Sequence, residues 1–168
     1  MRLTGKKAER YLRRSYTAVD GLWFVKVEEK FGFRTALTID REVWKVMPKI
    51  QARTLAALAG VKDRNIRTLA SCFAEKLMMD GFTFTSKREK DGFSVSVTAC
   101  PWFEALRKSG RERVAGRIGS AICTTEYGVW AAEFNNAAEF GLVSQICKGD
   151  RRCLFKFRSR KTFKRNEI

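Results

Sequence analysis

The chain has 168 residues, of which 45% are hydrophobic, and its 34 Lys and Arg against 18 Asp and Glu give a formal net charge of +16. A chain of this size and apolar content buries a core over roughly two-thirds of its surface, which excludes a disordered polybasic tail. The sequence contains no histidine, which excludes Ser-His-Asp and Cys-His catalysis, two-histidine zinc helices and histidine-held haem.

Three helices are predicted in the first half of the chain. The first runs from about Ala8 to Phe31 and ends at Gly32, and the second runs from Ala36 to Ala59. Pro48 must kink the second helix or begin a new one, because it lacks a backbone donor. The third spans Asp63 to Asp80. The apolar residues that define these helices are Tyr11, Leu12, Val19, Leu22, Trp23 and Val27 in the first, the inward Val43, Trp44, Met47 and Ile50 in the second, and Ile66, Leu69, Phe73 and Leu77 in the third.

The pattern changes to strands after Gly81. Alternating residues on both sides of a charged turn, which runs from Lys87 to Gly92 and closes on Asp91-Gly92, predict a β-hairpin, and Pro101 begins a short helix. One helix through Ile122, another from about Thr125 to Phe140, and two strands over 141–147 and 153–158 complete the series. We therefore expect an α+β fold with the order ααα-ββ-αα(α)-ββ, in which helices pack on one side of an antiparallel sheet. Residues 1–157 form the expected domain, and residues 158–168 form a basic, flexible tail.

The sequence predicts a cytoplasmic protein with no membrane partner. The beginning of the chain lacks the apolar segment of a secretory signal, and no stretch reaches the ~20 apolar residues of a membrane span.

The cysteines are the first candidates for a functional site. In the cytoplasm the five cysteines are free thiols or metal ligands rather than disulfides. Cys72 lies within an apolar stripe of a predicted helix, and we expect it to be a buried core residue. The other four end predicted elements, and the basic turn between the last two would lower the pKa of their thiols. These four are Cys100, Cys123, Cys147 and Cys153.

Longer segments of the sequence resemble a known family. AVDGLWFVKVEEKFGF, VWKVMPKIQAR, ACPWFEALRKSGRE and CKGDRRCLFKF are similar to a prokaryotic family labelled L-2-amino-thiazoline-4-carboxylic acid hydrolase-like. The resemblance covers roughly Tyr11 to Phe157. It implies a hydrolase of a cyclic amidine, in which water attacks the ring carbon between nitrogen and sulfur. A carboxylate base, Glu126 or Glu133, or a metal-bound water would activate that water.

The final third also resembles, more distantly, the 4-vinyl reductase-type domain, a small-molecule sensor that shares its fold with trafficking-complex subunits. Such domains hold zinc through a Cys, a Glu-x2-Cys about two dozen residues later, and a further Cys. The resemblance implies a zinc at Cys123, Cys147 and Cys153, but Ser144 stands where Glu is expected. Cys100 is favoured over Glu126 as the fourth ligand, and an iron–sulfur cluster is the alternative. A closed four-thiolate site would be structural, because it leaves no position for water.

The same resemblance implies a pocket between helices and sheet. Its expected lining comprises the aromatic residues Trp23, Trp44, Trp102, Tyr127, Trp130 and Phe134. Ordinary core packing is the alternative for each of them. The expected partner is therefore a small-molecule ligand, and a homodimer is left open.

The basic ends of the chain support a second hypothesis, nonspecific nucleic-acid binding through the phosphates. The tail interleaves Phe with basic side chains, as a segment that follows phosphates and stacks on bases would. A solvated basic surface is the alternative reading. The basic residues concerned are Arg2, Lys6, Lys7, Arg10, Arg13 and Arg14 at one end, and Lys148, Arg151, Arg152, Lys156, Arg158, Arg160, Lys161, Lys164 and Arg165 at the other.

Overall fold

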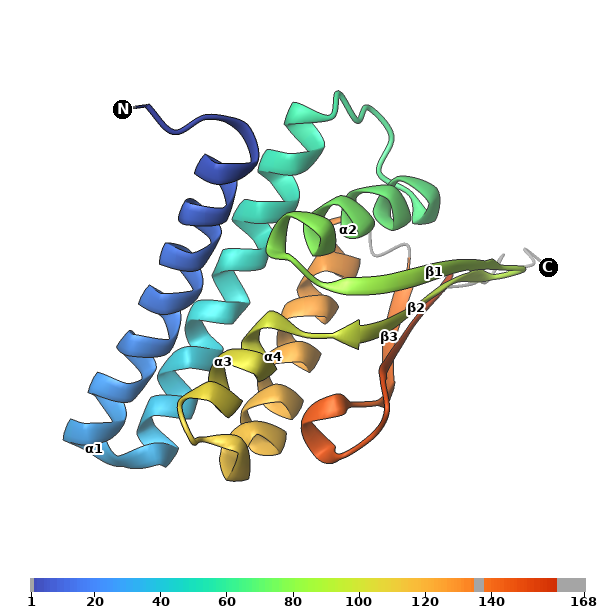
Figure 1. The fold of residues 1–168 in the computed structure, drawn as a ribbon. Coiled ribbons are helices and arrows are strands. Elements are labelled where there is room, and N and C mark those ends of the chain that lie inside the picture. The colour runs from blue at the N-terminus through green and yellow to red at the C-terminus, as the bar shows by residue number, and fades with distance from the viewer. Residues whose placement is uncertain (1, 135–137, 160–168) are drawn as a thin grey trace.

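A helical hairpin forms the first third of the protein. In this computed structural model, which describes residues 2–134 and 138–159, α1 (Gly5–Leu58) is interrupted only at Gly32, where φ is 80° and ψ is 161°. Glycine adopts such a positive φ without steric cost, so the chain reverses there and the two arms run antiparallel (Figure 1). The predicted helix boundary at Gly32 is confirmed. No new helix begins at Pro48, which is buried within the second arm.

The remaining elements confirm the predicted α+β class. Four strands form one antiparallel sheet in the order β1-β2-β4-β3. A Cβ at Gly92 would lie 1.9 Å from the Phe157 carbonyl oxygen, so only glycine fits at this hairpin turn. The elements after α1 are α2 (Ile66–Asp80), β1 (Thr83–Glu89), β2 (Gly92–Ala99), α3 (Pro101–Lys108), α4 (Glu112–Glu133), β3 (Ala138–Ser144), the short 3₁₀-helix η1 (Ile146–Lys148) and β4 (Cys153–Ser159).

Several predicted boundaries are wrong. The first strand continues through Glu89, into the predicted turn, and the strand expected over 141–147 ends at Ser144, before η1. A single helix, α4, replaces the two helices expected to meet between Ile122 and Thr125. The second of these predicted helices runs to Phe140, but Phe140 lies in β3, opposite Phe157 of β4. Phe140 follows the two-residue period of β3, because Phe140 and Leu142 pair with Phe157 and Phe155 on the neighbouring strand. The basic residues of 160–168 lie outside the described residues.

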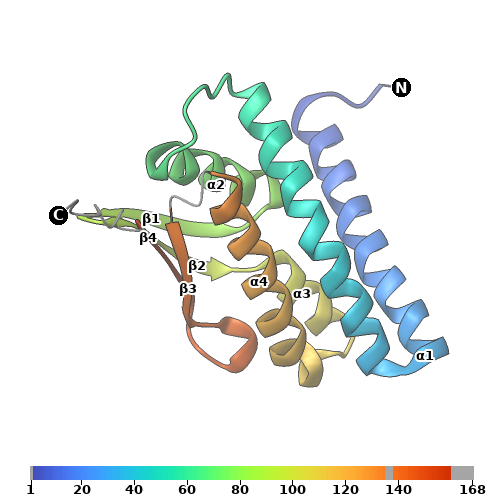
Figure 2. The same cartoon turned by 180° about the vertical axis from the view of Figure 1, so that it is seen from behind.

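The helix α4 lies between the hairpin and the sheet (Figure 2). It packs against α1 on one side and against β3 on the other, while α2 covers the adjoining part of the sheet. Aromatic residues fill the space between α2, α4 and the sheet, among them Phe73, Tyr127, Trp130 and Phe157, each at most 1% exposed. Helices therefore cover one face of the sheet, as predicted.

The hairpin turns many of its apolar side chains outward, contrary to expectation. Trp44 is buried as predicted, but Val43 and Ile50 of the same arm are exposed. In the first arm Val27 is buried, whereas five of the residues used to predict that helix are at least 60% exposed, namely Tyr11, Leu12, Val19, Leu22 and Trp23. Within residues 2–134 and 138–159, no helix combines the length and the apolar character needed to cross a membrane.

Candidate functional site

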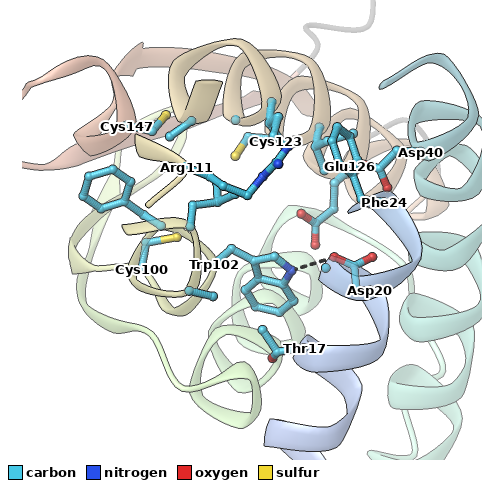
Figure 3. Close-up of a pocket in the computed structure, with 18 of the residues that line it drawn as sticks. Thr17, Asp20, Phe24, Asp40, Cys100, Trp102, Arg111, Cys123, Glu126 and Cys147 are labelled. Atoms are coloured by element: carbon cyan, nitrogen blue, oxygen red, sulfur yellow. Dashed lines mark hydrogen bonds between the residues drawn. The ribbon is translucent and has the colours of Figure 1, made fainter. Parts of the chain in front are cut away.

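A cavity of about 430 Å³ lies where the hairpin, α3, α4 and the end of the sheet meet. Both arms of α1 contribute to it, and the lower wall is formed by Trp102 of α3 (Figure 3). Its walls are mostly apolar, so the few polar side chains that reach it stand out. Two groups are prominent among them, which we call the acid end, composed of Asp20, Asp40 and Glu126, and the thiol end, composed of Cys100, Cys123, Cys147 and Cys153.

The acid end is built on the hairpin. Asp20 of the first arm accepts a hydrogen bond at 3.1 Å from the Trp102 indole Nε1. Burial raises the pKa of Asp20, and the indoles of Trp102 and Trp44 oppose that rise. Burial, together with the nearby charge of Asp20, raises the pKa of Asp40 in the second arm to about 7. Two carboxyl groups thus face one cavity with different affinities for a proton.

Glu126 joins the acid end to a buried ion cluster. Its carboxylate pairs with the ammonium of Lys76, which also lies 2.8 Å from Asp80 Oδ2. Burial raises the pKa of Glu126, and the Lys76 ammonium opposes that rise. Burial alone would lower the pKa of Lys76, but its two carboxylate partners outweigh this effect and raise it. Lys76 therefore stays charged, and it holds Glu126 in place at the cavity wall.

Arg111 brings a positive charge to the same cavity from the start of α4. Its guanidinium pairs with Glu28 and lies 5.8 Å from the centre of the Phe24 ring. Its Nε is buried and has no hydrogen-bond partner among residues 2–134 and 138–159. A buried donor without a partner costs free energy, and Arg111 is the one arginine in the described lining of the cavity.

The thiol end gathers four cysteines that are far apart in the sequence. In Figure 3, Cys100 and Cys147 lie on the side of the cavity opposite Asp20 and Asp40. A Cβ at Gly119 of α4 would lie 2.6 Å from Cys147 Sγ, so the absence of a side chain there makes room for the thiol. The Ile146 amide donates a hydrogen bond to Cys153 Sγ at 3.3 Å.

Burial dominates the chemistry of these thiols. It raises the pKa of Cys100 to about 12 and also raises that of Cys123, Cys147 and Cys153. The expectation that the basic turn 148–152 would lower the pKa of the last two is wrong. Lys148 acts on Cys147 in that direction, but the loss of solvent outweighs it.

The metal prediction depends on how closely these groups approach one another. Across the part of the chain that the structure describes, no group of three or more Cys, Asp or Glu is placed to hold a metal ion. Ser144 donates a hydrogen bond to the Arg152 carbonyl oxygen at 2.8 Å. As placed, the residues do not fit a four-coordinate site, and zinc or an iron–sulfur cluster stays a prediction. Elemental analysis tests it, since Cys147→Ser is expected to lower the zinc content and Cys72→Ser to preserve it.

The structure brings most of the predicted site residues to this cavity. The predicted residues that line it are the four cysteines and Trp44, Trp102, Glu126 and Tyr127. Four others lie elsewhere. Trp23 is on the outer side of the hairpin, and Trp130 and Phe134 are packed in the aromatic core. Glu133 forms an ion pair with Arg53, with Nε 2.8 Å from Oε2, and its Oε2 lies 3.7 Å from Arg64.

The sequence reading missed Asp20, Asp40 and Arg111. A signal for the two acids exists, because each shares a helix face with buried apolar residues: Asp20 with Phe24 four residues on, and Asp40 with Trp44 four residues on. An acid on the buried face of a helix needs a partner or a function. Arg111 follows a turn and carries no such pattern.

The fold and the cavity together define a class, an α+β protein whose helical hairpin closes a cavity that carries acids, an arginine and thiols. The chain belongs to the L-2-amino-thiazoline-4-carboxylic acid hydrolase family, whose model matches residues 12–157. No curated protein and no solved structure matches it. The resemblance to the 4-vinyl reductase-type domain therefore stays a prediction.

Proposed function

We propose that the protein hydrolyses a small cyclic amidine that carries a carboxylate, in the cavity between the hairpin and α4. The family description names such a molecule, 2-amino-thiazoline-4-carboxylic acid. The observation that supports the proposal is that Asp20, Asp40 and Arg111 line one mostly apolar cavity. Opposite charges at separate points suit a substrate with a basic group on one side and an acid group on the other.

The two aspartates suit different roles. Asp20, which accepts a hydrogen bond from Trp102, is the better partner for the protonated amidine. Asp40, with a pKa of about 7, is the better general base, because a base works best when its pKa is close to the working pH. The Arg111 Nε is the candidate donor for the substrate carboxylate.

The proposed reaction is an addition of water followed by ring opening. The water oxygen bonds to the ring carbon between nitrogen and sulfur, and the proton of the water passes to Asp40. The bond between that carbon and the ring nitrogen then breaks. Its electron pair stays on the nitrogen, which takes up the proton held by Asp40 and the proton that the added hydroxyl loses as it becomes a carbonyl. The nitrogen becomes the free amine of the opened chain, while the carbon keeps its sulfur as a thiocarbamate. Every atom of water ends in the single product.

The nucleic-acid hypothesis stays a prediction. The first residues of α1 and the end of β4 lie on opposite sides of the molecule in both views (Figures 1 and 2). Within 2–134 and 138–159, the two basic ends therefore do not adjoin, and no observation favours this function over hydrolysis.

The test is an assay of the full chain with 2-amino-thiazoline-4-carboxylic acid, followed by NMR detection of the ring-opened product. Asp40→Asn is expected to lower kcat by roughly 10²- to 10⁴-fold, as loss of a general base does. Asp20→Asn is expected to raise KM more than it lowers kcat. Asp63→Asn, an exposed acid between α1 and α2, is the matched control. Turnover that is absent from the wild type, or equal in Asp40→Asn and Asp63→Asn, would refute the proposal.

A further inference from the structure

The outer side of the helical hairpin carries an unusual number of exposed apolar side chains. Each of them is at least 38% exposed. We call this set the outer face, and it consists of Tyr11, Leu12, Val19, Leu22 and Trp23 in the first arm and Ile39, Val43, Val46 and Ile50 in the second. Leu22 lies at its margin, because it also lines the cavity. Monomeric proteins rarely expose so many large apolar residues together, and a patch of this kind marks an interaction site.

The two arms present their apolar residues next to one another. The Gln51 side chain donates a hydrogen bond to the Tyr16 hydroxyl at 3.4 Å, which marks the line where the arms meet. Leu12, Val19 and Trp23 lie four residues before, three after and seven after Tyr16, on the neighbouring part of the same helix surface. In the second arm, Val43 and Ile50 lie four residues before and three after Met47, which is itself one turn from Gln51. The outer face is therefore continuous across both arms.

The spacing of the outer face indicates the kind of partner. Ile39, Val43, Val46 and Ile50 are separated by four, three and four residues, and Leu12, Val19 and Leu22 fit the same alternation with Ser15 between them. This narrow seam is the pattern by which helices pack into coiled coils and four-helix bundles. A helix that lies in a membrane surface has a broader apolar face. The seam thus favours a partner made of helices.

We propose that the partner is a second copy of this chain, whose hairpin packs against the outer face to form a four-helix bundle. A stable interface needs roughly 800 Å² on each partner. Nine half-exposed large side chains supply an area on this scale, since each exposes on the order of 100 Å². An interface between two copies is self-complementary, and Ser15, which lies between Leu12 and Val19 in the seam, is uncharged.

The net positive charge of the hairpin predicts how salt changes the affinity of the dimer. The hairpin α1 carries twelve basic and six acidic side chains, so two copies repel one another around the rim of the interface. Added salt screens that repulsion and is expected to strengthen the dimer. Binding to an anionic lipid surface would respond in the opposite way, because salt weakens the attraction between a basic protein and such a surface.

Sedimentation equilibrium of the full chain tests the proposal, with an expected mass of twice 19.3 kDa. Val46→Glu places like charges inside the interface and is expected to raise the dissociation constant by roughly 100-fold or more. Val143→Glu is the matched control, because Val143 lies on edge strand β3 and is exposed to a similar extent, 60% against 54%. Circular dichroism checks that both variants fold.

Three outcomes would overturn the proposal. The first is a monomeric wild type at micromolar concentration in both low and high salt. The second is an equal effect of Val46→Glu and Val143→Glu on the dissociation constant. The third is a monomer that sediments with vesicles containing phosphatidylglycerol and is released by salt, which would assign the outer face to anionic lipid.

Discussion

The two ends of the cavity face the same space, and burial raises the pKa of the titratable groups at both, but the neighbours of those groups differ. At the acid end, the Trp102 and Trp44 indoles oppose the rise in the pKa of Asp20 and the Lys76 ammonium opposes it at Glu126, whereas the charge of Asp20 adds to the rise at Asp40, whose pKa is about 7. At the thiol end, burial outweighs every neighbour, and the pKa of each cysteine rises. The acid end therefore suits proton transfer, whereas the thiol end, with its thiols protonated, forms a soft, weakly polar wall.

This contrast shows that polar residues can lie close together at one cavity and still differ in their chemistry. A carboxyl group that keeps one partner, as Asp20 keeps Trp102, stays available to a ligand. A thiol without a cation or a metal beside it acts as a small apolar group. Substitutions at one end of the cavity at a time test this difference, with stability measured by urea unfolding of the full chain.

The largest effect on stability is expected from Lys76→Met at the back of the acid end. This change leaves Glu126 and Asp80 buried without their cation, which is expected to cost about 3–5 kcal/mol of unfolding free energy at pH 8. The cost is expected to shrink as the pH falls and Glu126, whose pKa is raised by burial, takes up a proton. Lys45→Met is the control, since Lys45 forms an exposed pair with Glu42 worth about 0–1 kcal/mol.

Equal losses in Lys76→Met and Lys45→Met would show that the buried cluster does not hold the acid end together. Glu126→Gln separates the two acids further. It leaves Lys76 paired with Asp80 and is expected to cost less than Lys76→Met, about 1–3 kcal/mol. A larger loss of unfolding free energy for Glu126→Gln than for Lys76→Met would contradict the prediction that Lys76 is the charge that stabilises the cluster.

A smaller effect, which depends on pH, is expected at Asp40. Its pKa is about 7 in the folded chain and about 4 in the unfolded chain, so the folded chain holds the proton in the window between these values. The unfolding free energy of the wild type therefore falls as the pH rises from about 4 to about 7. Asp40→Asn lacks this term. It is expected to be more stable than the wild type above pH 7, because it buries no charge at this position. The expected difference is only on the order of 1–2 kcal/mol, since the Asp40 side chain is partly solvated.

The same group predicts the pH dependence of activity. Below pH 7 the proposed base is protonated, so kcat is expected to fall about tenfold for each pH unit. A stability difference between the wild type and Asp40→Asn that does not change with pH would show that Asp40 titrates normally. A pH–rate profile without an ionisation near 7 would remove Asp40 from the proposed reaction.

Much of the fold could be predicted because local chemistry determines it. Gly32 ends a helix, Gly92 follows the two-residue turn between the alternating strands, and Pro101 begins a helix, each through its own backbone preferences. Periodicity alone could not decide the fate of Phe140, because the strand it joins is defined by its partner β4. It also could not tell which apolar face of the first arm is buried, because that arm has two.

The site was predictable only in part for a related reason. Cysteines at the ends of elements and tryptophans with helical spacing are visible in the sequence, and many of them reach the cavity. Asp20 and Asp40 line the same cavity because the hairpin reverses at Gly32, and Glu133, at the end of α4, lies outside that cavity and pairs with Arg53. Pairing between distant segments decides both, and a single sequence does not record such pairing.

The smallest expected effect tests whether the thiol end is simply a packed wall, through the glycine that faces it. A Cβ at Gly119 would lie 2.6 Å from Cys147 Sγ, so Gly119→Ala forces the thiol to move and is expected to cost about 1 kcal/mol. Gly128→Ala is the control in the same helix, because nothing lies within 4 Å of its Cβ. It is expected to stabilise the protein by about 0.5–1 kcal/mol, since alanine favours a helix over glycine.

The sharpest form of this experiment reverses the sign of the effect. In a Cys147→Ala background the thiol is gone, so Gly119→Ala no longer meets an obstacle and is expected to stabilise the protein by about 0.5–1 kcal/mol, like Gly128→Ala. If Gly119→Ala destabilises both backgrounds equally, Cys147 is not the neighbour that requires glycine. The reversal would show that the thiol occupies the space that Gly119 leaves open, which is the packing role that distinguishes this end of the cavity from the acid end.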